Sequence, residues 1–107
     1  MNVFVLINLS NIKSSAVTTF LNSCPEVRNW YQTSNLFALV TTTSLIETRD
    51  LLNKLFQGQM FLVLQTSVGE RGSAAGYMPP DFWDFVIYPK DSGYWDTKLK
   101  EIANKMS

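Results

Sequence analysis

The residue types that carry out most enzymatic chemistry are scarce in this sequence. It contains no histidine and a single cysteine, Cys24. Ser-His-Asp and Cys-His sites and nearly all zinc sites are therefore excluded, and no disulfide can form within the chain. Cys24 lies on the apolar side of a predicted helix, so we interpret it as a buried, unreactive thiol. We assign no catalytic residue.

Two pairs of acidic residues have a spacing that a divalent metal could use. Asp81 and Asp84 are three residues apart on a predicted helix, and Glu47 and Asp50 repeat that spacing. Structural roles explain them equally simply. Asp81 offsets a helix dipole, Asp84 is solvated, and Glu47 forms a capping box with Ser44. We favour these roles and expect neither a metal nor a cofactor.

A glycine-rich segment could bind an anionic ligand. Residues 69–76 read GERGSAAG and include Arg71, so their backbone amides could cradle a phosphate. The segment lacks the Lys-Ser/Thr pair of a phosphate-binding loop. A loop that contacts a partner is the interpretation we favour.

Aromatic side chains give the clearest indication of a binding surface, because they stack on bases and dominate protein interfaces. Phe82 and Phe85 fit a core, and Trp83 fits both a core and a surface. Tyr94 and Trp95 lie between helix breaks, where a core role is less evident. The predicted partner-binding residues are Arg71, Tyr77, Trp83, Tyr94 and Trp95.

The charge balance limits the classes of partner. Nine basic and nine acidic residues give a net charge of zero, whereas proteins that grip nucleic acid by charge carry a basic excess. Nucleic acid is therefore possible as a partner but not favoured. The longest apolar runs fall short of a membrane span, and one cysteine suits a reducing compartment. We expect a cytoplasmic protein that does not bind membranes.

The elements that position these residues follow from the hydrophobic pattern. A period of two predicts strands, and apolar residues at i, i+3, i+4 and i+7 predict helices. The predicted strands are 3–9, 27–32, 36–42 and 60–65, with helices over 12–24 and from Ser44 to Gly58. This order is the split βαβ of a ferredoxin-like α+β fold, with four antiparallel strands and two helices on one face. Another chain or the C-terminal segment must cover the second face.

The length of 107 residues predicts one domain, with a core over 1–67 and a loop and helical extension over 68–107. We expect Ser10 or Asn11 to cap the first helix, and Gly58 to end the second in a left-handed conformation. The sequence Pro79-Pro80-Asp81 predicts a short helix. Asp96 then caps a last helix, whose apolar stripe comprises Leu99, Ile102, Ala103 and Met106.

Several motifs together resemble a known family. They are an apolar first strand with a polar end, Trp30 in the second strand, S-x-x-E-x-R-D-x-L from Ser44, and GYMPPDFWDFV over residues 76–86. In order and spacing, residues 1–87 resemble the SinR-like small bacterial proteins. These are related to the small endonuclease-like subunit of CRISPR adaptation complexes.

The resemblance implies a homodimer formed by sheet packing. For the nuclease relatives it also implies a metal-binding aspartate at the end of the first strand. The matching residue here is Asn8, whose amide is a poor ligand for a hard cation. An alternative role for Asn8 is to cap the first helix through its side chain.

These observations favour a non-catalytic homodimeric interaction or scaffold protein that binds a protein partner or nucleic acid. The surface would comprise residues 69–83 and the C-terminal tail. Two alternatives stay open. One is a divalent-metal-dependent endonuclease using acids other than position 8. The other is a protein that binds a nucleotide or another small ligand at the dimer interface.

Overall fold

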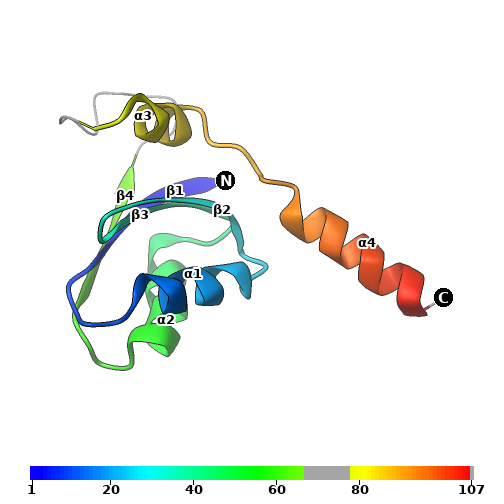
Figure 1. Ribbon diagram of the computed structural model, residues 1–107, viewed down its shortest axis with the longest axis horizontal. Helices are drawn as coiled ribbons and strands as arrows, with labels where there is room; N and C mark the ends of the chain where they lie inside the picture. The colour runs from blue at the N-terminus through cyan, green and yellow to red at the C-terminus, as the bar shows by residue number, and fades with distance from the viewer. Residues whose placement is uncertain (67–77, 107) are drawn as a thin grey trace.

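A computed structural model of the chain describes residues 1–66 and 78–106 and confirms the predicted α+β fold (Figure 1). Over residues 2–66 the elements follow the order strand, helix, strand, strand, helix, strand, and two helices come after residue 78. The elements are β1 (Asn2–Asn8), α1 (Ser14–Asn22), β2 (Val27–Thr33), β3 (Leu36–Thr41), α2 (Leu45–Phe56), β4 (Phe61–Thr66), α3 (Pro80–Ile87) and α4 (Tyr94–Met106). The strands form one antiparallel sheet in the order β2-β3-β1-β4.

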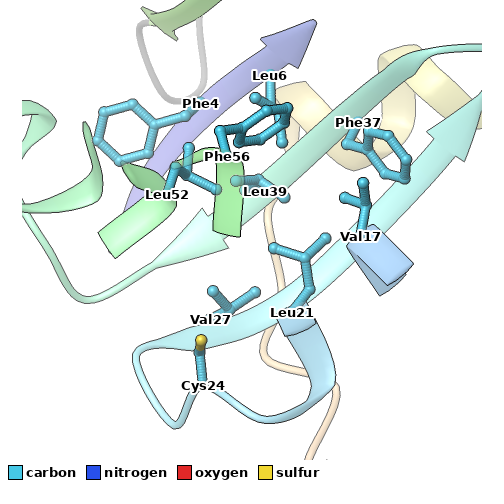
Figure 2. Packing of buried hydrophobic residues seen from close by; sticks show 10 residues of the cluster. All are labelled: Phe4, Leu6, Val17, Leu21, Cys24, Val27, Phe37, Leu39, Leu52 and Phe56. Carbon is cyan, nitrogen blue, oxygen red and sulfur yellow. The ribbon is translucent and has the colours of Figure 1, made fainter. Parts of the chain in front are cut away.

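Helices α1 and α2 cover one face of the sheet. Side chains at alternate positions of β1 and β3 point to that face, where they meet the apolar sides of both helices (Figure 2). Phe56 of α2 stacks on Phe61 of β4, with ring centroids 4.6 Å apart. The buried cluster consists of Phe4, Leu6, Val17, Leu21, Cys24, Val27, Phe37, Leu39, Leu52 and Phe56.

Helix α3 covers part of the opposite face. Phe82 and Val86 pack against Val3, Ala38 and Val40, and all five side chains are buried. The C-terminal segment thus covers this face over β1 and β3, as the sequence required. Two leucines of β4 on the same face stay exposed.

Three predicted helix ends differ from the structure. Helix α1 begins after Lys13, which makes no side-chain cap, so the cap expected from Ser10 or Asn11 is wrong. The left-handed residue that ends α2 is Gln57, and Gly58 follows it with a positive φ as well. Asp96 lies inside the first turn of α4, where its carboxylate contacts an arginine of β2 and does not cap the helix.

The last helix extends away from the body of the protein (Figure 1). The radius of gyration is 14.4 Å, compared with about 13 Å for a compact domain of this length. Every side chain described from Asp96 to Lys105 is exposed. Helix α4 therefore adds little to the core and presents both of its faces.

The capping box of α2 is formed as predicted and allows a test of stability. The backbone N–H of Glu47 donates to the Ser44 hydroxyl, and the Glu47 carboxylate accepts from the Ser44 N–H, which lowers the pKa of Glu47. We expect Ser44→Ala to lower the free energy of unfolding by about 1 kcal/mol, measured by urea denaturation. Ser15→Ala, at an exposed position within α1, is the control and should leave stability nearly unchanged; equal losses in both variants would contradict this role.

Candidate interaction surface

Asn8 joins three segments of backbone at the end of β1. Its Nδ2 donates to the Ile12 carbonyl at 2.8 Å, and its Oδ1 accepts from the N–H and hydroxyl of Ser10. Its main chain exchanges hydrogen bonds with Asn35 in the β2–β3 turn. The side chain is 7% exposed, and both of its polar atoms have partners. Asn8 thus fixes the loop before α1, but it neither caps that helix nor points to a cavity.

The acidic pairs do not converge on a cation site. Asp81 and Asp84 are exposed on α3 beside a shallow depression shared with Asn29 and Lys90. Within residues 1–66 and 78–106, no three acidic or cysteine side chains are grouped as a metal would require. Cys24 is buried, and its thiol donates to the Phe20 carbonyl. Burial raises the pKa of Cys24, which disfavours the reactive thiolate.

Arg28 of β2 binds the segment that leads into α4. Its Nε lies 2.6 Å from a carboxylate oxygen of Asp91, and its Nη2 lies 3.0 Å from Asp96. Its carbonyl accepts from both the N–H and the hydroxyl of Ser92. Asn29 donates to the Lys90 carbonyl at 3.0 Å. We call this set, Arg28 and Asn29 with residues 90–92 and Asp96, the Arg28 clasp.

The clasp has a defined dependence on pH. The Gly93 N–H and then Arg28 lower the pKa of Asp91, since both stabilise its carboxylate. Because the pKa of Asp91 is lowered, its contacts with Gly93 and Arg28 contribute fully to stability at any pH above the ordinary pKa of an aspartate. That contribution is lost only as the pH falls through the lowered pKa. The clasp is therefore intact at neutral pH.

Two of the predicted partner-binding aromatics have different environments at the start of α4. Trp95 is only 9% exposed and lies beside Val27 and Trp30, so it anchors the helix to the body. Tyr94 is 44% exposed and packs edge-on against Trp95, with Lys98 above its ring. A partner could reach Tyr94 but not most of Trp95.

The remaining predicted residues divide between the core and a segment outside the description. Trp83 is partly buried and packs edge-on against Phe82, with ring centroids 5.3 Å apart. It belongs to the core between α3 and the sheet. Arg71 and Tyr77, like the glycine-rich segment 69–76, lie outside the described residues. Their contacts with a partner stay a prediction.

Beyond Trp95, α4 carries an apolar stripe that nothing in the described chain covers. Leu99 is 53% exposed and Ile102 is 45% exposed. They lie three residues apart and share one side of the helix with Trp95. Together with Tyr94 at its base, this pair forms what we call the α4 stripe. It is an apolar surface on a helix whose first turn is held in place by the Arg28 clasp.

The sequence predicted an apolar stripe of Leu99, Ile102, Ala103 and Met106, of which Leu99 and Ile102 belong to the α4 stripe. It gave no indication of the Arg28 clasp that positions the helix. Arg28 is 63 residues from Asp91 and 68 from Asp96, and no local pattern marks such a pairing. Isolated charged residues at these separations look alike whether they pair or not.

Comparison of the chain with protein-family models, curated proteins and solved structures gives no match. None of the helices in the described ranges has the length and apolar character needed to cross a membrane.

Asn8 gives a test that separates a structural role from a metal site. Asn8→Asp removes the donor to the Ile12 carbonyl and buries a carboxylate beside it, so we expect a loss of about 1–3 kcal/mol in unfolding free energy. Urea denaturation with and without Mg²⁺ measures this. Asn11→Asp, at an exposed neighbour, is the control and should change little. If Mg²⁺ stabilised Asn8→Asp, the end of β1 at residue 8 would be shown to bind metal.

The Arg28 clasp predicts which backbone amides depend on it. Arg28→Gln removes both carboxylate contacts, so we expect hydrogen exchange of residues 92–97 to become faster while that of β1 and β3 is unchanged. Arg49→Gln is the matched control, because the ion pair that Arg49 makes within the described part of the chain is with its exposed neighbour Asp50. Unchanged exchange over residues 92–97 in Arg28→Gln would show that the clasp does not hold α4.

Proposed function

We propose that this chain is a non-catalytic, homodimeric interaction protein that binds a protein partner through the α4 stripe. The observation that carries the proposal is the exposure of Leu99 and Ile102 on a helix held at its base. The resemblance to the SinR-like proteins agrees with a small homodimer. Asn8, at the position of the relatives' metal-binding aspartate, supports a role without catalysis.

An isolated helix of 13 residues is marginally stable in water and depends on packing of its apolar face. Among the α4 side chains that the structure describes, residues 94–105, Trp95 alone is buried, and the stripe beyond it faces solvent. A partner that covered Leu99 and Ile102 would complete the burial of this face. Recognition of a helix through apolar residues three and four positions apart is a common mode of protein binding.

The charges of α4 favour a protein over nucleic acid. Lys98, Lys100 and Lys105 are accompanied by Asp96 and Glu101, so the helix carries a net charge of only +1. Binding to phosphates draws on a basic excess and declines steeply with salt. Apolar contact at the stripe would depend little on salt, so the two kinds of partner can be separated by titration with salt.

The stripe is tested by replacing its two exposed apolar residues. We expect Leu99→Glu/Ile102→Glu to abolish capture of a specific protein that the wild-type chain retains from a cell extract, as measured by affinity capture and mass spectrometry. Leu9→Glu/Ile46→Glu is the matched control, since Leu9 is 50% and Ile46 is 55% exposed away from α4. It adds the same charge and should retain the partner.

Three outcomes would contradict the proposal. Equal capture by both variants would exclude the stripe as the binding surface. Retention that falls steeply with salt would indicate nucleic acid. Cleavage of RNA or DNA that requires Mg²⁺ or Mn²⁺, and is lost in Asp81→Ala or Asp84→Ala, would show an endonuclease.

A further inference from the structure

The two edge strands of the sheet, β2 and β4, differ in the contacts that the rest of the described chain makes with them. At the β2 edge, the Arg28 carbonyl accepts from Ser92, and Asn29 donates to the Lys90 carbonyl. Among the residues that the structure describes, β4 pairs only with β1, on its inner side. Within those residues, no strand lies beside the backbone N–H and C=O groups on the outer side of β4. Among the described residues, the β4 edge is therefore the more open of the two.

Strand β4 lacks the features that usually prevent such extension. Its sequence, FLVLQT, contains no charged residue and no proline. The only register shift in the sheet lies between β2 and β3, so β4 pairs with β1 without a bulge. Natural proteins protect edge strands with charge, proline or bulges. An edge without them is suited to pairing with another strand.

The side chains of β4 add an apolar surface to this edge. Phe61 and Val63 face α2 and pack against the main cluster. Leu62 and Leu64 alternate with them and face the opposite side, where they are 43% and 50% exposed. Helix α3 packs on that side over β1, β3 and Tyr31 of β2, and the cluster it forms there does not include the two leucines of β4. Among the residues that the structure describes, the outer edge of β4 and these two exposed leucines therefore form one continuous surface.

The order of residues in β4 makes the strand complementary to itself. In an antiparallel pair centred on Val63, Leu62 of one copy lies opposite Leu64 of the other, and Phe61 lies opposite Gln65. Residues opposite each other share a face, so all four leucines gather on the side that α3 leaves open. The same pairing keeps Val63 of both copies on the helix-covered side.

From this complementarity we propose that β4 binds β4 of a second copy of this chain, joining two sheets into one of eight strands. The inference rests on the homodimer of the proposed function and assigns its interface. The absence of charge along β4 favours an identical, equally uncharged strand over a charged partner. The α4 stripe, attached at the β2 edge, stays accessible in each copy.

The interface is tested by sedimentation velocity over a wide range of protein concentrations, with circular dichroism to verify folding. We expect the wild-type chain to dimerise and Leu62→Glu/Leu64→Glu to be monomeric at every concentration, because like charges would then face each other. Leu99→Glu/Ile102→Glu, with equally exposed residues on α4, is the matched control and should dimerise as the wild type does. A folded wild-type monomer, or a dimer that survives the β4 substitutions, would overturn the inference.

The register is tested by cross-linking mixed variants. In a mixture of Leu62→Cys and Leu64→Cys chains, the two new thiols lie opposite each other, so oxidation should give a covalent dimer containing both. Wild type, whose only thiol is the buried Cys24, is the control and should not cross-link. Absence of the mixed species from a dimeric sample would overturn this pairing.

The two proposals fail separately. Loss of partner capture in Leu99→Glu/Ile102→Glu with an intact dimer concerns the α4 stripe alone. If the wild-type chain is a monomer that still captures its partner through the α4 stripe, the β4 interface and the homodimer are both wrong. The α4 stripe then remains the partner-binding surface. A dimer lost only on substitution of the stripe would reassign the interface to α4 and overturn the inference.

Discussion

The need to cover both faces of β1 determines most of this structure. Phe4 and Leu6 point to one face of the central strand and Val3 to the other, and all three are fully buried. Two apolar faces require two layers of packing, which a four-stranded sheet with helices on one side alone does not supply. Helices α1 and α2 form the first layer, and α3 supplies part of the second. Helix α3 is short and packs on β1, β3 and Tyr31 of β2, and Leu62 and Leu64 of β4 stay exposed on the same side.

The position of α4 follows from the path of the chain after α3. The segment 88–93 returns along β2, where backbone and side-chain groups of Arg28 and Asn29 hold it. Exposed ion pairs contribute little individually, but here two carboxylates share one guanidinium while the main chain is fixed by Ser92. Trp95 adds the apolar contact that gives the first turn its direction. From Asp96 to Lys105 the side chains of the helix are then exposed.

The sequence predicted features that depend on local periodicity and missed those that depend on distant pairing. All four strands were located to within one or two residues, and the capping box at Ser44 was correct because both partners lie within one helical turn. The predicted cap of α1 at Ser10 or Asn11 was wrong because the Asn8 side chain fixes the loop before α1 by a hydrogen bond to the Ile12 carbonyl. That hydrogen bond competes with capping, and no distinctive spacing in the sequence marks it. The candidate surface was predicted in part: the α4 stripe followed from its helical repeat, but the burial of Trp95 depends on β2, which is far away in sequence.

The segment along β2 also has a consequence for growth of the sheet. Ser92 donates both its main-chain N–H and its hydroxyl to the Arg28 carbonyl, and the Asn29 side chain donates to the Lys90 carbonyl. The segment thus occupies a backbone acceptor of β2 without itself forming a strand. A sheet open at both edges can add neighbours indefinitely and polymerise into fibres. In this protein the segment 90–92 lies against the start of β2, where an added strand would have to displace it. In a dimer joined through β4, as proposed, this obstacle at β2 would disfavour the addition of further chains at that edge.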